Sequence, residues 1–342
     1  MTQLAKIVTL ALIFLILGVP AQPNSQAAAQ NAQTTEPFHI FMVVWRGRTP
    51  VEDGFEAYLR ERGIPYRITF RNLERDRGRI PGFVDEINEL KPDLVYTWGT
   101  STSTGILGKF GDRDTDTHAQ DIPGIFTLVA YPVAAGLVAS DEQPGGSVTG
   151  VRFLAPVEAQ LNAIRAYRPF ERLAVIYNPN ERNSTLNVEE LRRYAQSEGF
   201  TLIEKPAPMD EGGKPIGAEV PALVLSAKSD GAEFLYIGPD SFTAVNADAL
   251  TSTAILVGLP TFAATEFPLL NSQAMSGLVS RYYSLGKLTG RQAERILVDG
   301  VAPEDLPVAS LSRYSLILNM PVVRALEIYP PMSMLQIADI IR

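Results

Sequence analysis

Three polar side chains, Glu181, Asn183 and Ser184, lie just after a short apolar run and an Asn-Pro-Asn turn. The apolar run, residues 173–177, is typical of a strand buried on both faces of a parallel sheet. The apolar spacing of residues 188–197 predicts a helix directly after it. Ligands of open α/β sheets bind where a strand ends and a helix begins, and the first helical N–H groups can bind an anion. The alternative is that Asn183, Ser184 or Asn187 only caps the helix.

Similar polar groups follow three other predicted strands, at residues 94–98, 234–237 and 260–264. The first of them breaks into five consecutive hydroxyl residues between two glycines, which offer neutral donors and acceptors. The polar residues at these strand ends are Thr100, Ser101, Thr102, Asp240, Ser241 and Glu266. Because parallel strands bring their carboxyl ends to one edge, we expect these groups to face a shared binding site.

Motifs for catalysis are mostly missing. The two histidines, His39 and His118, lie in a predicted strand and a polar loop, and no G-x-S-x-G, G-x-G-x-x-G or Walker sequence is present. The aspartates of residues 112–116 have the spacing of a calcium loop, but the glycine and glutamate that such a loop requires are absent. We therefore predict no enzyme, no cofactor and no metal site, although paired carboxylates at Asp240 and Glu266 remain open as an alternative.

Length and composition limit the class of protein. A chain of 342 residues predicts two domains, and 46% hydrophobic with 20% charged residues is typical of a globular protein. The net charge of −8 argues against nucleic acid as a partner, because binding phosphates requires a basic face. Cysteine is absent, which excludes disulfides and thiol nucleophiles.

The N-terminus has the features of a secretory signal peptide spanning residues 1–29. Lys6 precedes an apolar run at residues 7–19, and small residues follow at 27–29. The run is shorter than the roughly 20 residues of a membrane-spanning helix, so an uncleaved anchor is the less favoured alternative. Cleavage after Ala29 or Ala21 would release a soluble protein into the periplasm.

The rest of the chain alternates predicted strands with predicted helices in two successive arrays. Residues 49–52 match a capping box at the first helix, and residues 282–298 predict a late amphipathic helix. The predicted strands cover residues 38–44, 66–70, 94–98, 125–129 and 145–151, then 173–177, 201–204, 234–237, 260–264 and 315–319. This alternation predicts an α/β protein with two Rossmann-like lobes, each a parallel sheet flanked by helices.

Four segments carry a resemblance to a known family: residues 177–184, residues 132–150, residues 282–286 and Leu318-Asn319. Together they resemble the ABC-transporter substrate-binding proteins of the tryptophan/tyrosine type, which have the type I periplasmic-binding fold. The resemblance extends over residues 38–330.

The resemblance implies two lobes that close by a hinge on a small ligand, with an ABC permease as partner. Lobe 1 would consist of residues 37–152 and 281–308, and lobe 2 of residues 153–280 and 309–342. Three crossovers would lie near residues 151–156, 279–283 and 306–314. A module that reports ligand occupancy to a membrane receptor would have the same fold and is the alternative function.

The resemblance also implies a hydrophobic or aromatic amino acid, or a related carboxylate, as ligand. Neutral hydroxyl and amide groups would bind its carboxylate: Thr100, Ser101, Thr102, Asn183 and Ser184. Either Asp240 or Glu266 would bind its ammonium group.

Aromatic and basic residues complete the list of candidates. Tyr131 takes the place of the aspartate that the family usually has before proline, so it either stacks on a flat ligand, closes one side of the site or is simply buried. Trp45 and Trp98 have the same alternatives. Arg46 and Arg48 either meet an anionic ligand or lie in solvent.

Overall fold

The computed structural model describes residues 36–112, 117–119 and 122–342. The predicted signal peptide, residues 1–29, and most of the aspartate loop at 112–116 lie outside the described residues. Residues 37–342 form one compact unit, which contains everything discussed below. Within the described residues, no helix combines the length and the apolar character that crossing a bilayer requires.

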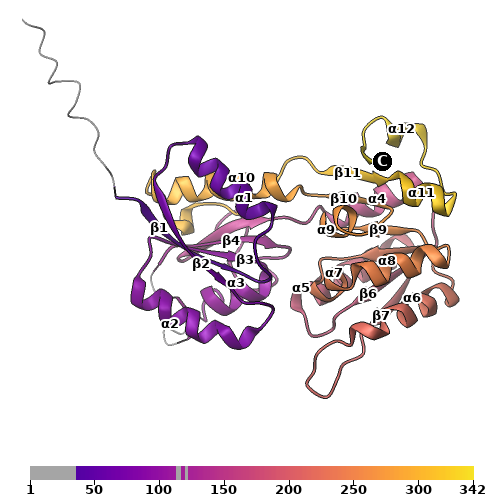
Figure 1. Cartoon of the computed structure of the whole chain (residues 1–342), viewed down its shortest axis with the longest axis horizontal. Coiled ribbons are helices and arrows are strands. Elements are labelled where there is room, and N and C mark those ends of the chain that lie inside the picture. The colour runs from indigo at the N-terminus through magenta and orange to yellow at the C-terminus, as the bar shows by residue number, and fades with distance from the viewer. Residues whose placement is uncertain (1–35, 113–116, 120–121) are drawn as a thin grey trace, which may run out of the picture. The chain divides into compact units, whose positions relative to one another are not determined.

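The first half of the chain forms a five-stranded parallel sheet with the order β2-β1-β3-β4-β5 (Figure 1). Its strands are β1 (Phe38–Val44), β2 (Tyr66–Asn72), β3 (Leu94–Trp98), β4 (Gly124–Val129) and β5 (Val148–Arg152). Its helices are α1 (Pro50–Glu61), α2 (Ile80–Leu90), α3 (Thr100–Leu107) and the late α10 (Tyr282–Leu297), with a short 3-10 helix at Arg77–Arg79. Strands β3 and β4 are apolar runs and are buried throughout. Such runs are typical of parallel strands that helices cover on both faces.

The second half forms a seven-stranded sheet with the order β12-β11-β10-β9-β8-β6-β7. Its strands are β6 (Arg172–Tyr177), β7 (Thr201–Pro206), β8 (Phe234–Ile237), β9 (Thr261–Ala263), β10 (Ser276–Val279), β11 (Ser315–Asn319) and β12 (Asp339–Ile341). Every pair is parallel except β10 with β11, so this sheet is mixed where the sequence predicted a parallel one.

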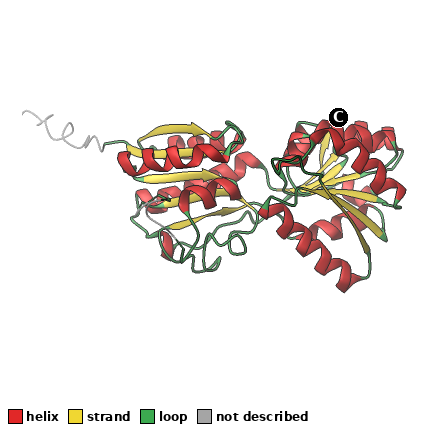
Figure 2. Cartoon of the chain, turned by 90° about the horizontal axis from the view of Figure 1, so that it is seen from below, coloured by secondary structure: helices red, strands yellow, loops and turns green. Residues whose placement is uncertain are grey.

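Helices cover both faces of each sheet, as Figure 2 shows. Those of the second half are α4 (Val157–Tyr167), α5 (Arg182–Glu198), α6 (Val220–Ser229), α7 (Ser241–Val245), α8 (Ala247–Leu256), α9 (Phe267–Leu270), α11 (Met320–Leu326) and α12 (Met332–Leu335), with 3-10 helices at Gly217–Glu219 and Pro303–Asp305.

The chain passes three times between the two sheets. It leaves the first sheet after β5, returns after β10 to form α10, and leaves again before β11. Two of these connections lie side by side, since Val151 forms a parallel bridge with Ala309. Each half is therefore built from segments that are far apart in the sequence.

The predicted capping box at residues 49–52 is confirmed. The Thr49 hydroxyl accepts from Val51 N, while Glu52 Oε2 accepts from Thr49 N at 2.8 Å. Glu52 is fully buried and its other oxygen accepts from the Tyr96 hydroxyl at 2.6 Å, which ties α1 to β3. Burial raises the pKa of Glu52, and these hydrogen bonds oppose that shift.

Helices α1 and α10 approach each other closely because glycines lie at their contact. A Cβ at Gly54 would lie 2.1 Å from the carbonyl oxygen of Tyr283, and one at Gly286 would lie 1.9 Å from that of Val51. The late helix predicted at residues 282–298 thus packs against the first helix of the chain, and no larger residue fits at these two positions.

Candidate functional site

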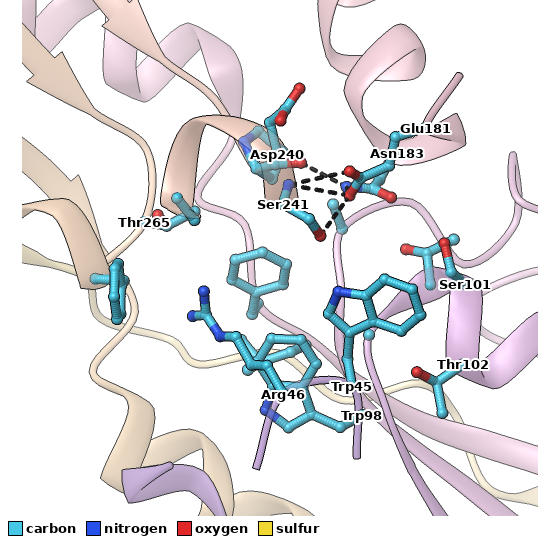
Figure 3. A pocket seen from close by; sticks show the side chains of 18 of the residues that line it. Trp45, Arg46, Trp98, Ser101, Thr102, Glu181, Asn183, Asp240, Ser241 and Thr265 are labelled. Carbon is cyan, nitrogen blue, oxygen red and sulfur yellow. Dashed lines mark hydrogen bonds between the residues drawn. The ribbon is translucent and has the colours of Figure 1, made fainter. Parts of the chain in front are cut away.

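A pocket lies at the carboxyl ends of the strands of both sheets. Its lining side chains enclose about 590 Å³ of space, part of which is open to solvent. Nine of the twelve residues predicted as ligand-binding line it: Trp45, Arg46, Thr100, Ser101, Thr102, Glu181, Asn183, Asp240 and Ser241 (Figure 3). The edges of the two sheets therefore share one cavity, at the place where open α/β sheets bind their ligands.

The wall formed by the first sheet offers hydrogen-bond donors. Trp45 follows β1, Trp98 ends β3, and Thr102 lies in the first turn of α3. Within the described residues, the Nε1 atoms of both tryptophans and the Oγ1 atom of Thr102 are buried without a hydrogen-bond partner. Buried polar groups are rarely left unpaired, so three such atoms on one pocket indicate that a ligand supplies their partners.

Arg46 lies between two aromatic rings in this wall. Its guanidinium carbon is 5.2 Å from the centre of the Trp98 ring and 4.4 Å from that of Phe267, which begins α9 of the second sheet. Among the described residues it forms no hydrogen bond and no ion pair. Burial lowers the pKa of Arg46, as does the nearby Arg75, while the neighbouring Tyr282 and Glu181 act against that effect. Because an arginine pKa lies far above 7, the group remains a cation.

Glu181 faces the pocket from the second sheet, at the start of α5. Its Oε1 accepts from Asn183 Nδ2 and from Ser241 Oγ, each at 2.9 Å, and its Oε2 accepts from Ser241 N at 3.1 Å. Burial, followed by the nearby charge of Asp240, raises the pKa of Glu181 to about 7. A carboxyl that changes charge near neutral pH is thus aimed at the pocket.

Asp240 also lines the pocket, but hydrogen bonds within the protein occupy both of its oxygens. Oδ2 accepts from Asn178 N at 2.7 Å and from the Ser184 hydroxyl, and Oδ1 accepts from Thr243 N at 3.0 Å. Burial raises the pKa of Asp240, against the effect of these bonds. The side chain joins the loop after β6 to the loop after β8, so its geometry is that of a structural residue.

The substitution Asp240→Ala should therefore destabilise the protein by about 3 kcal/mol, because it leaves a buried hydroxyl and two backbone N–H groups unpaired. Chemical denaturation of the ligand-free protein measures this change. Ser252→Ala is the control, since Ser252 is a half-buried serine that bonds only to carbonyls of its own helix. A loss below about 1 kcal/mol for Asp240→Ala would show that the two loops hold together without it.

Three predicted residues lie outside the pocket lining. Ser184 lies behind Asp240, to which it donates. Glu266 accepts from Tyr282 N at 2.7 Å and pairs with Arg281 at 2.8 Å. Tyr131 lies with its hydroxyl 3.0 Å from Asn187 Nδ2, which donates to it across the two sheets. All three have partners within the protein, and in this structure none of them is placed to touch a ligand in the pocket.

The contact of Tyr131 continues into the second half as a chain of buried hydrogen bonds. Asn187 Nδ2 also donates to the Tyr236 hydroxyl at 3.3 Å, which donates to Gln160 Oε1 at 2.9 Å. Burial raises the pKa of both tyrosines.

Arg48, the second arginine among the candidates, lies at the surface and pairs with Asp53 and Glu56.

Several pocket residues were not among the predicted ones. Phe153, Thr265, Phe267 and Tyr282 add aromatic and polar surface from the crossovers and from the segment after β9. Leu128 lines the pocket in the left-handed conformation, with φ of 52°, where the pairing of β4 with β5 is irregular. A non-glycine residue held in this region is strained, and such strain is commonly found at binding sites.

The pocket thus presents donors and a cation on one wall, a carboxyl on the other, and aromatic rings between them. This arrangement suits a small amphoteric ligand with an apolar part. Within the part of the chain that the structure describes, no three histidine, aspartate or glutamate side chains are grouped to hold a metal ion.

The comparisons with known proteins agree with one another. The profile of a family described as ABC transporter substrate binding protein matches residues 41–341. A tyrosine-binding protein of Clostridioides difficile (strain R20291) is 27% identical over 279 residues, which are 80% of this chain and 75% of that protein.

Two solved structures have the same fold. An ABC domain of Streptococcus pneumoniae in complex with L-Trp has a TM-score of 0.74 at 23% identity, over 89% of this chain and all of that one. The ligand-free, open form of a substrate-binding protein with adhesive properties from Clostridium difficile has a TM-score of 0.67 at 26% identity, over 89% of this chain and 99% of that one.

Proposed function

Because the chain belongs to the ABC transporter substrate-binding proteins, a family of solute receptors and not of enzymes, we propose that it captures an amino acid or a related carboxylate for an ABC importer. One observation supports this proposal above the others. Arg46 and three residues with unpaired buried polar atoms line the same aromatic pocket as the Glu181 carboxyl. A small ligand that combines an anionic group, an ammonium group and an aromatic part complements such a surface.

The ligand carboxylate would lie at the start of α3, against Thr100, Ser101 and Thr102, while Asn183, whose amide already donates to Glu181 and to the Pro239 carbonyl, would only line the opposite wall. Hydroxyl groups and the unpaired N–H groups of a helix start suit an anion. Its ammonium group would face Glu181, whose hydrogen-bond partners Asn183 and Ser241 themselves line the pocket. Asp240 instead holds two loops together and Glu266 lies outside the pocket. The aromatic walls and the relatives named for tyrosine and L-Trp favour an aromatic side chain.

Binding would be coupled to closure of the two lobes about their three connections. Both lobes contribute lining residues, so a ligand that touches both favours the closed arrangement. Arg46 with Phe267, and Tyr131 with Asn187, are contacts between lobes that closure would keep. After removal of the predicted signal peptide, the protein would act as a monomer in the periplasm and deliver its ligand to an inner-membrane permease.

A thermal-shift screen of the chain without residues 1–29 tests this function. Amino acids and small carboxylates are the probes, and an aromatic amino acid should stabilise the protein by about 2.7 kcal/mol at a hundredfold excess over Kd. If no amino acid and no carboxylate raises the melting temperature, the proposed function is wrong.

The substitution Thr102→Val then tests the position of the site. Valine has the same shape but no hydroxyl, so it should leave the ligand-free protein unchanged or slightly more stable, because a buried unpaired group is removed. The ligand found in the screen should bind about tenfold more weakly. Thr104→Val is the matched control in the same helix, since the Thr104 hydroxyl bonds to carbonyls of its own helix and lies outside the pocket. Equal affinities of both variants would contradict the assignment.

A further inference from the structure

The pocket offers more donors than a single ligand carboxylate can use. In the proposed function, the carboxylate is bound at the start of α3. The Arg46 guanidinium and the indole N–H groups of Trp45 and Trp98 are then left over, and all three lack a hydrogen-bond partner among the described residues. A carboxylate has two oxygens, whereas these groups add five N–H donors of the guanidinium and one of each indole. A second group of the ligand is needed to satisfy them.

The surroundings of Arg46 determine how such a group can approach. The guanidinium carbon lies over the rings of Trp98 and Phe267, 5.2 Å and 4.4 Å from their centres, so two aromatic rings pack against it. The N–H groups along its edge form no hydrogen bond among the described residues. That edge matches the two oxygens of a carboxylate in a planar, bidentate pair.

The two indoles reinforce this preference. Figure 3 shows Arg46 and the Trp45 indole extending toward the middle of the pocket, with Glu181 and Ser241 on the far side. An indole N–H can only donate, so it gains nothing from an ammonium or an apolar group placed beside it. A ligand with an electrically neutral, apolar side chain would leave these donors and a buried cation unpaired when the pocket closes.

The charged groups around Arg46 do not replace such a partner. Glu181 and Glu52 attract it and Arg75 repels it, but none of them forms an ion pair with it. Glu52 is already bound by Thr49 and Tyr96, and in the proposed function Glu181 pairs with the ligand ammonium.

We infer that the natural ligand carries a second acidic group, whose carboxylate binds to the N–H groups of Arg46 beside the Trp45 indole. The ligand class is thus an amino acid or small acid with a negatively charged group at the end away from its first carboxylate. This inference rests on the proposed function and names the ligand class of the same pocket.

Two probes that differ by one carboxyl group test the inference: L-phenylalanine and 4-carboxy-L-phenylalanine. Titration calorimetry of the chain without residues 1–29 should show at least about tenfold tighter binding of the carboxylated probe, because it gains a bidentate charged pair. Arg46→Met keeps the bulk of the side chain and should abolish this preference, with about 30-fold weaker binding of the carboxylated probe. Arg46→Lys keeps the positive charge but lacks the planar pair of N–H donors, so it should keep only part of the preference for the carboxylated probe.

Two further variants complete the experiment. Arg48→Met is the matched control, because Arg48 is a neighbouring surface arginine paired with Asp53 and Glu56, and it should change neither affinity. Trp45→Phe removes one N–H group and keeps an aromatic ring, so it should weaken the carboxylated probe about fivefold and L-phenylalanine by less than twofold. If Arg46→Met does not fold, the effect of Trp45→Phe on the affinities of the two probes tests the inference instead.

The outcomes separate the two proposals. If L-phenylalanine binds as tightly as the carboxylated probe and the variants affect both equally, the second acidic group is excluded while the proposed function stands. If neither probe binds and no amino acid or carboxylate stabilises the protein, the proposed function itself fails.

Discussion

Replacing Glu181 by glutamine is expected to weaken the binding of an amino-acid ligand about 30-fold above pH 7, where the Glu181 carboxylate is charged. The glutamine carbonyl can still accept from the Ser241 hydroxyl and N–H, so the local structure should persist. What the variant loses is the negative charge that faces the ligand ammonium.

The pH dependence of binding follows from the same group. The pKa of Glu181 is about 7 in the ligand-free protein, and an ammonium ligand favours the carboxylate form. Affinity should therefore be highest above pH 7 and fall by up to about tenfold for each pH unit below it. In Glu181→Gln this dependence should disappear.

The stability of the ligand-free protein should change with pH in the opposite sense. The folded-state pKa of Glu181 lies above its ordinary value of 4.5, so the uncharged form is favoured by folding. The contribution of Glu181 to stability is thus complete below pH 4.5 and is lost as the pH rises to about 7. Denaturation of both proteins at several pH values should show this loss only when Glu181 is present.

A deaminated ligand provides the control for Glu181. L-phenylalanine and 3-phenylpropionate share the carboxylate and the ring, but only the first carries an ammonium group. Titration calorimetry should show that Glu181→Gln weakens the first strongly and changes the second by less than about threefold. Equal weakening of both would mean that Glu181 only holds the loop of Ser241 in place.

The second large effect concerns stability. Gly286→Ala should destabilise the protein by about 3 kcal/mol, because the new methyl group would lie 1.9 Å from the Val51 carbonyl oxygen and 2.8 Å from Phe55 N. Both of these atoms belong to the backbone of α1 and cannot rotate away. The two helices would have to separate, which would open the core beneath them. Urea denaturation of the ligand-free protein measures the change.

Gly82→Ala is the matched control for that substitution. Gly82 also lies inside a helix, α2, but nothing lies within 4 Å of the position that a Cβ would take. Alanine should leave the stability unchanged or raise it by up to about 1 kcal/mol. If Gly286→Ala behaves like Gly82→Ala, the close packing of α1 on α10 is not what holds this helix pair.

Most of the strands could be predicted because they are buried. Residues 94–98 and 315–319 are apolar runs, and the structure forms β3 and β11 over the same residues. The strands that were not predicted lack this signal. In β10 the run begins with Ser276 and Gly277, and β12 has three residues that are mostly exposed. Antiparallel pairing of β10 with β11 depends on the path between the sheets, which local sequence does not record.

Helix α3 shows a second limit. Its first five residues all carry hydroxyls, a composition that favours caps and turns over helix interiors. The helix forms nevertheless, and the hydroxyls of Ser103 and Thr104 bond back to the carbonyls of Gly99 and Thr100. The local sequence could not show that hydrogen bonds to backbone carbonyls would satisfy the hydroxyls of Ser103 and Thr104.

Sequence could place the candidate site at strand ends, but not assign the role of each acid. Asp240 and Glu266 were equivalent candidates for an ammonium group. In the structure, Asp240 accepts hydrogen bonds from Asn178, Ser184 and Thr243. Glu266 forms an ion pair with Arg281 and accepts a hydrogen bond from Tyr282 N. Which carboxyl stays available depends on such partners from distant segments, and they become visible only when the chain is folded.

The late position of α10 in the sequence has a consequence for how the chain folds. The first sheet depends on residues 282–297 to cover it, and the second depends on β11 and β12 to finish its edge. During synthesis neither half can complete its hydrophobic layers until almost the whole polypeptide has emerged from the ribosome. A newly made chain of this architecture therefore stays open for most of its translation, which is the state that a translocation channel for unfolded polypeptides accepts.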